Sequence, residues 1–378
     1  MKKIKVGVIG AGNISFYHVR GLQMVGVYGD YEVDMVSIAD PDLDAANKLG
    51  KRFGFKKITD NWKEVINDPE IEVVSIVTPN CTHAEIAIAA AKAGKHVMLE
   101  KPMAMNVEED KLIEKTFAET GVVNMVDFIY RTVPANIEAK KLVEDGRIGK
   151  ITAFRGWFDA SFKADPQKEL QWRDVASKAG TGSLGDTIAH VISLSDLITK
   201  SQLGEIIEVC ADMDIVYKTR KDLENGGKET EVDTDDICSV LVKYENGRTG
   251  VIYASRVATG HDCCMGYEIQ GSNGMITFNL DRINELEFFE KDDYETKGFK
   301  TVLGNPEHGD YSVFTPYEEM GISYADLFSM HYQKLFKAID DKNNKIDIDV
   351  NYGSKVDRIM FAMLRSAKEK RWVKVEEI

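Results

Sequence analysis

The sequence has few cysteines and no long apolar run, and each lack excludes a class of protein. The five cysteines among 378 residues are odd in number and form no CxxC pair, which is typical of reduced thiols. No stretch reaches the roughly 18 consecutive apolar residues of a membrane helix. The opening run MKKIKVGVIGAG is broken by Gly7 and Gly10 and has no small-residue cleavage site, so we expect no signal peptide. We therefore expect a cytoplasmic protein with no membrane partner and no metal site.

Positive charge is also scarce, because 48 basic side chains face 62 acidic ones and give a formal net charge of −14. Binding to nucleic acid depends on clustered Lys and Arg, so we expect no nucleic-acid partner. The same charge disfavours strongly anionic substrates. Any bound phosphate must instead meet backbone amides. With 43% apolar and 29% charged residues, the chain can bury a large core and is long enough for two domains.

Residues 1–130 alternate short apolar runs with helical patterns. This rhythm predicts an α/β domain, a doubly wound Rossmann parallel sheet that is covered by helices on both faces. The expected strands are residues 4–9, 33–39, 73–77, 96–99 and 122–126, and the expected helices include residues 42–53, 84–93 and 107–119.

Residues 131–378 have a different pattern, with a helix at 135–144 followed by many alternating β-rich runs. They predict an α+β domain with one large, open, mostly antiparallel sheet. A single layer of helices covers only one face of such a sheet, so we expect a homodimer or homotetramer formed through the other face. We expect the polar insert at 218–233 to be a mobile surface loop. Two helices near 325–340 and 353–370 complete the domain.

The stretch IKVGVIGAGNIS predicts a strand, a glycine turn and a helix start. Gly10 permits the tight turn, and Gly12 lets the backbone approach a pyrophosphate on the amides of the helix start, at Asn13 and Ile14. Ser15 stands at the third small position of the fingerprint. A glycine turn with a purely structural role is the alternative.

The second strand ends in Asp40, which is well placed to accept hydrogen bonds from both ribose hydroxyls of an adenosine. A carboxylate there repels a 2′-phosphate, so NAD is favoured over NADP. A plain turn or cap residue is the alternative.

The stretch VTPNCTHAE follows the strand at 73–77 and adds further candidates for the cofactor site. Ligands of open α/β sheets bind at the carboxyl ends of the strands, which is where Thr78, Pro79 and Asn80 fall. Thr82 is expected to cap the next helix. His83 is a candidate cofactor contact, with an ordinary first-turn histidine as the alternative.

The stretch VMLEKPMAMN places Glu100 and Lys101 at the carboxyl end of another strand, on the edge that carries the glycine turn. They therefore face the nicotinamide end of a bound dinucleotide. Pro102 restricts the backbone of Lys101, so its ammonium is aimed. An exposed lysine in a salt bridge is the alternative.

Asp186 and His190 are four residues apart in GTGSLGDTIAHVISLSDLI and share one face of a predicted helix. Histidine can take a proton near neutral pH, and a neighbouring carboxylate can orient it, so the pair is a candidate general base. A capping acid and a satisfied buried histidine are the alternatives.

Together, GAGNIS, Asp40, TPN, EKP and the Asp186/His190 helix resemble the Gfo/Idh/MocA family of oxidoreductases. The resemblance spans nearly the whole chain, including DGRIGKI and SAKEKRWVKV. It implies a Rossmann domain, an open-sheet domain, a nicotinamide cofactor and hydride exchange with a sugar or cyclitol. The family's catalytic Lys, Asp and His correspond here to Lys101, Asp186 and His190. The family often has Gly two positions after this Asp, whereas this chain has Ile188, which puts the local pocket shape in doubt.

Sugar sites combine aromatic faces with polar groups, and several aromatic residues of this chain fit that description. The segment LQWRD is similar to a WR segment in sugar-acting members of the family, and a structural ion pair is the alternative for its arginine. His261 and Asp262 are further candidates, with a loop pair as the alternative. The candidates for substrate contacts are Tyr130, Trp157, Phe158, Phe162, Trp172, Arg173 and His190.

Three functions are compatible with these residues. The first is an NAD-dependent dehydrogenase that acts on a neutral sugar, glycoside or inositol. The second is an NAD-assisted glycosidase that oxidises its substrate transiently and eliminates the aglycone. The third is a non-catalytic regulator that binds a dinucleotide, which the presence of all three catalytic residues disfavours.

Overall fold

The computed structural model describes residues 1–291, 297–308 and 320–378, which form two compact units. The first unit contains Met1–Ile129 together with Ser323–Lys355, and the second contains Tyr130–Ile322 together with Val356–Ile378. Residues 323–355 thus contact the first unit, although the chain reaches them only after the sheet of the second. The division into folding domains 1–130 and 131–378 stays a prediction.

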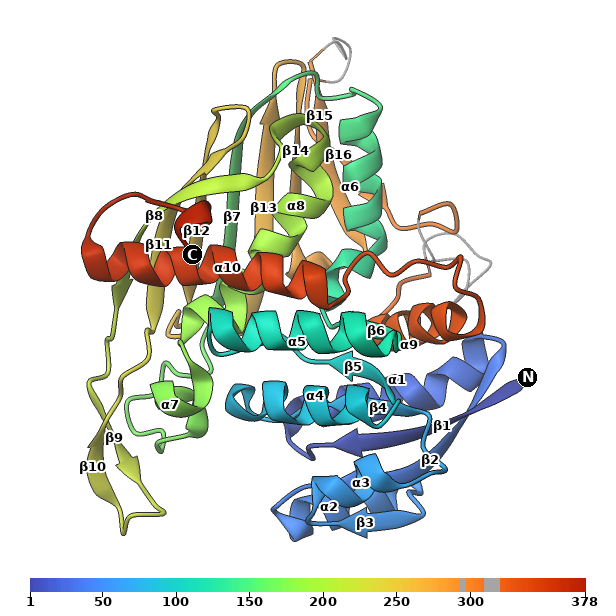
Figure 1. The fold of residues 1–378 in the computed structure, drawn as a ribbon. Coiled ribbons are helices and arrows are strands. Elements are labelled where there is room, and N and C mark those ends of the chain that lie inside the picture. Colours follow the sequence, from blue (N-terminus) through green and yellow to red (C-terminus); the bar gives the residue numbers. More distant parts are fainter. Residues whose placement is uncertain (292–296, 309–319) are drawn as a thin grey trace. The chain divides into compact units, whose positions relative to one another are not determined.

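The first unit contains a six-stranded parallel sheet with the order β3-β2-β1-β4-β5-β6 (Figure 1). This order reverses direction between β1 and β4, as in the doubly wound folds that bind dinucleotides. The predicted parallel sheet is confirmed. Its strands are β1 (Lys2–Ile9), β2 (Tyr31–Ala39), β3 (Lys57–Thr59), β4 (Val73–Ile76), β5 (His96–Leu99) and β6 (Asn124–Val126).

Helices cover this sheet, and the central strand β4 is buried along its whole length. Helix α1 packs closely on α9, because a Cβ at Gly21 would lie 2.5 Å from the Cβ of Phe328. Helices α4 and α5 are neighbours in the same unit (Figure 1). The helices are α1 (Asn13–Tyr28), α2 (Leu43–Phe53), α3 (Trp62–Asn67), α4 (His83–Lys92), α5 (Val107–Thr120) and α9 (Tyr324–Asp340).

The second unit contains a nine-stranded sheet with the order β16-β15-β14-β13-β7-β12-β11-β8-β17. Its pairs are antiparallel except β7 with β12, so the predicted, mostly antiparallel sheet is confirmed. The strands are β7 (Ile151–Ala160), β8 (Ile206–Asp214), β11 (Ile237–Tyr244), β12 (Thr249–Ser255), β13 (Cys263–Gly271), β14 (Gly274–Asn279), β15 (Glu285–Glu290), β16 (Lys300–Leu303) and β17 (Val373–Lys374).

In the second unit, helix α8 contacts β7 and β13, and helix α6 contacts β14 and β15. A Cβ at Gly156 of β7 would lie 2.5 Å from Val191 of α8, so strand and helix approach very closely there. The helices are α6 (Pro134–Glu144), α7 (Ala176–Ala179) and α8 (Ala189–Leu203), and α10 (Val350–Glu369) runs from the first unit into the second.

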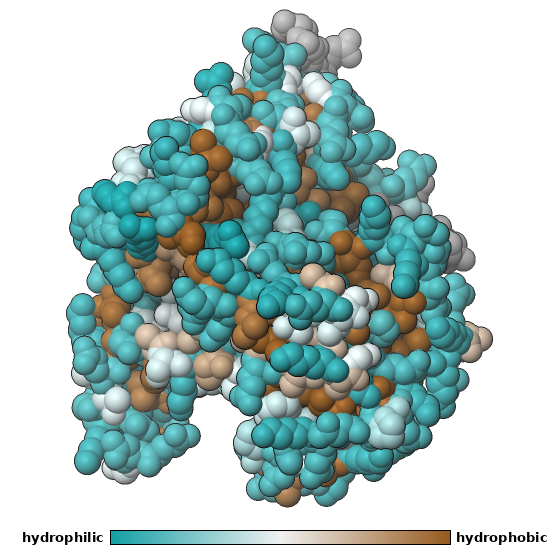
Figure 2. Space-filling view, in the orientation of Figure 1, coloured by the Kyte–Doolittle hydropathy of each residue, from teal (hydrophilic) through white to brown (hydrophobic). Residues whose placement is uncertain are grey.

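Two local expectations were wrong. The polar insert forms an antiparallel hairpin of β9 (Thr219–Asp222) and β10 (Lys228–Glu231), which extends from the end of the large sheet (Figure 1). Figure 2 shows its surface as mostly hydrophilic. Thr82 precedes α4, but its side chain accepts no capping hydrogen bond; its hydroxyl donates to the carbonyl of Pro79 in the preceding turn. None of the helices within the described ranges combines the length and the apolar character of a membrane span.

Candidate functional site

The glycine turn lies between β1 and α1, at the carboxyl edge of the parallel sheet. Gly10 has a φ of +109°, and a Cβ there would lie 2.3 Å from the carbonyl oxygen of Val77, so only glycine fits. Gly12 differs, because no heavy atom lies within 4 Å of the position of its Cβ. The turn therefore has open space beside Gly12, directly before Asn13 and Ile14 at the start of α1, where a pyrophosphate is expected.

Asp40 follows β2 and is tied to the glycine turn. One carboxylate oxygen accepts a hydrogen bond of 2.7 Å from the amide of Ala11, and the other accepts one of 2.8 Å from the amide of Asp42. Each oxygen keeps a second lone pair that can accept from a ribose hydroxyl. The carboxylate thus has a turn function and still has capacity for the predicted one.

Thr78, Pro79 and Asn80 follow β4, at the same edge of the sheet as the glycine turn. Their neighbour His83 is fully buried, and its two ring nitrogens lie 2.9 Å from the carbonyl of Pro102 and 2.8 Å from that of Thr78. Burial lowers the pKa of His83, against the opposing effect of these two carbonyls. His83 therefore joins two loops of the edge, and a direct cofactor contact for it stays a prediction.

Glu100 and Lys101 lie directly after β5, where the chain passes through a cis peptide bond to Pro102. One carboxylate oxygen of Glu100 lies 2.9 Å from Nε2 of His18, and the other accepts a hydrogen bond of 3.1 Å from the amide of Lys101. The carboxylate therefore holds the backbone from which the lysine side chain projects.

Sequence reasoning missed a buried network behind this lysine. Nδ1 of His331 lies 2.6 Å from Asp127, and Nε2 of His18 lies 3.3 Å from the same carboxylate. Burial alone would raise the pKa of Asp127, but the contact and hydrogen bond with His331, together with the electrostatic effects of His18 and Lys101, lower it. Asp127 thus stays ionised and adds negative potential near the ammonium of Lys101.

Three of these side chains have the donor types that bind metal ions. Ligand atoms of His18, Glu100 and Asp127 lie within 4.8 Å of one another. However, Nδ1 of His18 lies 2.8 Å from the hydroxyl of Tyr332, and its Nε2 contacts Glu100, so both ring nitrogens are already used. We interpret the group as a hydrogen-bonded network that supports the edge of the sheet.

In the second unit, Asp186 lies on a π-helical segment, Leu184–Ile188, and His190 lies on the first turn of α8. Such segments are often found at functional sites because they change the direction of side chains. His190 is 7% exposed, and its ring packs edge to face on Tyr130, with 4.7 Å between the ring centres. The structure thus brings Tyr130 and His190 together.

The two aromatic residues of β7 lie on different faces of the sheet. Phe158 lies on the face that carries α8, because its ring centre is 6.1 Å from that of His190. Side chains alternate along a strand, so Trp157 lies on the opposite face, where it meets Arg155. Phe158 rather than Trp157 therefore contacts the histidine, and a substrate contact for Trp157 has no support from this packing.

Arg173 and Trp172 lie on a short 3₁₀ segment, Trp172–Asp174. Nε of Arg173 lies 3.2 Å from a carboxylate oxygen of Asp186, and its guanidinium stacks 4.2 Å above the ring of Trp172. The segment thus contacts the helix that carries the predicted general base.

Comparison with known proteins identifies a family for both parts of the chain. Residues 4–128 match the model of the oxidoreductase family with an NAD-binding Rossmann fold, and residues 137–277 match the Gfo/Idh/MocA C-terminal domain. The chain is 35% identical to levoglucosan dehydrogenase of Pseudarthrobacter phenanthrenivorans, over 100% of both chains. It is 30% identical to scyllo-inositol 2-dehydrogenase (NAD(+)) of Bacillus subtilis, over 72% of this chain and 73% of that protein.

Solved structures lead to the same family. A levoglucosan dehydrogenase in complex with NADH and levoglucosan superimposes with a TM-score of 0.93, at 35% identity and over 100% of both chains. The chain therefore belongs to the Gfo/Idh/MocA family of oxidoreductases, whose amino-terminal domain is an NAD-binding Rossmann fold.

Proposed function

We propose that this protein is an NAD-dependent dehydrogenase that oxidises a secondary hydroxyl of a neutral sugar, with anhydrosugars such as levoglucosan as the first candidates and inositols as the second. The observation that carries this proposal is the likeness to levoglucosan dehydrogenase along the whole of both chains. Asp40, which disfavours a 2′-phosphate, supports NAD as the cofactor.

Each of the three predicted catalytic residues has one role in this reaction. His190 takes the proton of the hydroxyl as general base, and Asp186 orients the imidazole or binds a neighbouring hydroxyl. Lys101 donates a hydrogen bond to the substrate oxygen and stabilises its developing negative charge. When bound, the nicotinamide accepts the hydride from the carbon that carries this oxygen.

The other predicted site residues are assigned to either the cofactor or the substrate. We assign the turn around Gly10 and Gly12 to the pyrophosphate, and the residues after β4 and β5 to the nicotinamide half of NAD. Tyr130, Trp172 and Arg173 are proposed to contact the sugar. We further propose that the protein works in the cytoplasm, which its free cysteines support.

We also propose that the protein is a homo-oligomer formed through the open face of the nine-stranded sheet. Leu241 of β11 and Val251 of β12 are directly opposite in register and are 47% and 44% exposed. Two adjacent exposed aliphatic side chains on a sheet face favour burial against a second copy of the chain.

A substrate screen tests the function. Levoglucosan, inositols, free pyranoses and aryl glycosides are each incubated with NAD or NADP, the absorbance at 340 nm is followed, and the products are identified by mass spectrometry. We expect NADH to accumulate with NAD and at least one neutral sugar. Release of an aglycone without net NADH would favour the glycosidase instead, and tight NADH binding without any turnover would favour the regulator.

A further inference from the structure

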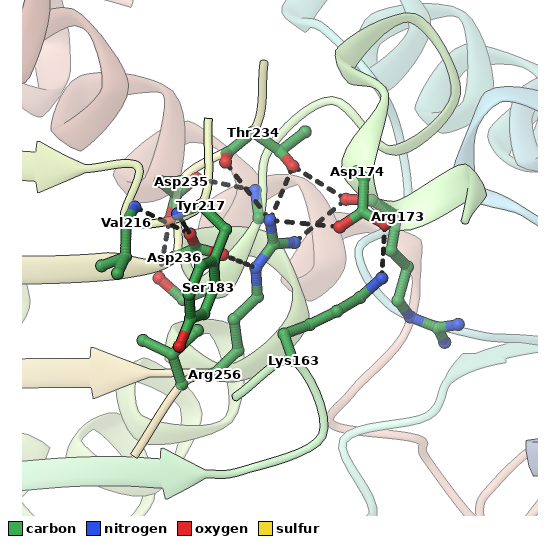
Figure 3. Close-up of polar contacts among 12 residues, drawn as sticks. Lys163, Arg173, Asp174, Ser183, Val216, Tyr217, Thr234, Asp235, Asp236 and Arg256 are labelled. Carbon is green, nitrogen blue, oxygen red and sulfur yellow. Dashed lines mark hydrogen bonds and ion pairs between the residues drawn. The ribbon is translucent and has the colours of Figure 1, made fainter. Parts of the chain in front are cut away.

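The segment Thr234, Asp235 and Asp236 precedes β11 and is buried, and each of its side chains bonds a different part of the second unit (Figure 3). All three side chains are at most 6% exposed. Polar groups buried in this way are costly unless they are bonded, so these contacts specify a definite geometry.

Asp235 binds the start of the helix that carries the predicted catalytic pair. Its carboxylate accepts hydrogen bonds from the amide of Gly182 (2.6 Å), the hydroxyl of Ser183 (2.6 Å) and the amide of Leu184 (2.9 Å). The approach is so close that a Cβ at Gly182 would lie 1.8 Å from the carbonyl oxygen of Asp235. Asp235 therefore fixes the backbone two residues before Asp186.

Thr234 binds the segment that carries the substrate candidates. Its hydroxyl donates a hydrogen bond of 2.9 Å to the carbonyl of Arg173 and accepts one of 2.9 Å from Nη2 of Arg256. Nη1 of Arg256 donates to the same Arg173 carbonyl at 3.0 Å. The backbone of Arg173 is thus held by two donors, while its side chain reaches Asp186.

Asp236 holds the arginine that takes part in this contact. Its carboxylate accepts a hydrogen bond of 2.8 Å from Nε of Arg256 and further bonds from the amides of Val216 and Tyr217. Figure 3 shows the side chain of Arg256 between Asp236 on one side and Thr234 and Asp174 on the other. The arginine cannot rotate away without leaving buried charges unpaired.

We propose that Thr234, Asp235 and Asp236 form a positioning segment that sets the placement of Arg173 relative to Asp186 and His190. All three side chains are buried and bonded to protein groups, so we assign them a positioning role rather than a direct contact with substrate or cofactor. The expected effect on kcat/KM rests on the proposed function. The expected effect on the placement of Arg173 does not depend on turnover.

The first test uses Thr234→Val, which keeps the shape and removes both hydrogen bonds of the hydroxyl. We expect kcat/KM for the sugar to fall about tenfold, because a displaced Arg173 loses a hydrogen bond to the transition state, while the Kd of NADH stays within about twofold. Thr234→Ser should restore activity, because serine keeps the hydroxyl. Thr230→Val is the matched control, since Thr230 lies on β10 of the hairpin.

A double-mutant cycle separates positioning from general destabilisation. If Thr234 acts through Arg173, Thr234→Val should change kcat/KM by less than about twofold in an Arg173→Ala background. Equal effects in both backgrounds, or a fall in NADH affinity that matches the fall in kcat/KM, would overturn the proposal.

The second test does not need a substrate. In Asp235→Asn, amide hydrogen exchange in peptides that cover residues 182–186 should accelerate at least about tenfold, because the carboxylate bonds to two of these amides. Asp212→Asn on β8 is the surface control. A crystal structure of Thr234→Val should show Arg173 Nε and Asp186 beyond hydrogen-bond distance, against 3.2 Å here.

The outcomes distinguish the two proposals. A wild-type protein that oxidises no sugar overturns the function, while exchange and crystallography still decide the positioning role. Unchanged exchange in Asp235→Asn together with an unchanged Arg173–Asp186 pair in Thr234→Val overturns the positioning role, whatever the activity of the wild type.

Discussion

At the scale of single residues, the two glycines of the cofactor turn have separable roles. Gly10 combines a positive φ with a close carbonyl, so its requirement is one of folding. Gly12 has a φ of −75° and open space around its Cβ position, so any requirement there comes from a ligand. The fingerprint alone does not distinguish these cases.

We predict that Gly10→Ala lowers the stability of the first unit, because alanine is strained at a φ of +109° and its Cβ meets the Val77 carbonyl. The cost should exceed about 1 kcal/mol. Gly12→Ala should melt like the wild type but bind NADH at least about tenfold more weakly. Calorimetry and fluorescence titration measure both quantities. Normal NADH binding by Gly12→Ala would place the pyrophosphate elsewhere.

The proposed role of Lys101 can be tested directly by substitution. We predict that Lys101→Ala lowers kcat by about a hundredfold or more, because a preorganised donor to the developing charge contributes on the order of 3 kcal/mol. NADH affinity should change little. Lys115→Ala, which removes an exposed lysine of α5, is the control. A kcat within about threefold of the wild type would remove Lys101 from the reaction.

At the scale of elements, a buried ion pair joins the loop after β7 to the Trp172–Asp174 segment. Nζ of Lys163 lies 2.5 Å from Asp174, and both side chains are fully buried. Burial lowers the pKa of Lys163 to about 8, Asp174 opposes this, and the charges of Arg256 and Arg220 add to it. The folded structure therefore favours the neutral form of Lys163 more than the unfolded chain does.

This pKa predicts an unusual dependence of stability on pH. Between about 8 and the ordinary value of 10.5, the unfolded chain holds a proton on Lys163 that the folded chain has lost. The unfolding free energy should therefore rise with pH across this window, by at most about 3 to 4 kcal/mol. Below pH 8 both states are protonated and the contribution is constant.

The measurement is the melting temperature of wild type minus that of Lys163→Met from pH 7 to 10.5. The difference cancels the titration of other groups, and we expect it to increase by several degrees with pH. A flat or falling difference would mean that Lys163 keeps its proton in the folded state.

At the scale of the whole molecule, sequence patterns predicted both sheets because apolar periodicity reports burial directly. They could not predict that residues 323–355 contact the first unit, since the bond between His18 and Tyr332 joins residues 314 positions apart. The hairpin of β9 and β10 was predictable, because Asn225 and Gly226 form a typical hairpin-turn pair. Its polar composition was taken to indicate a loop instead of a pair of strands.

The candidate site was likewise predictable only in part. Motifs located Gly10, Asp40 and Lys101, whose roles depend on local backbone. The partners that fix Asp186, such as Asp235, lie about fifty residues away and carry no motif, so only the folded chain reveals them. Trp157 and Phe158 are different, because neighbours on a strand point to opposite faces, and the sequence alone suffices to separate them.

The open face of the large sheet gives the last prediction. Ile252 of β12 is fully buried and pairs with Gly156 on the face that meets α8, so its neighbour Val251 points to the opposite face, together with Leu241. Sedimentation should give a multiple of 42.3 kDa for the wild type and 42.3 kDa for Leu241→Glu, because a buried, unpaired carboxylate opposes association. Leu112→Glu on α5, where the leucine is 49% exposed, should keep the wild-type mass. A monomeric wild type, or an unchanged mass for Leu241→Glu, would show that this face meets solvent rather than a second copy.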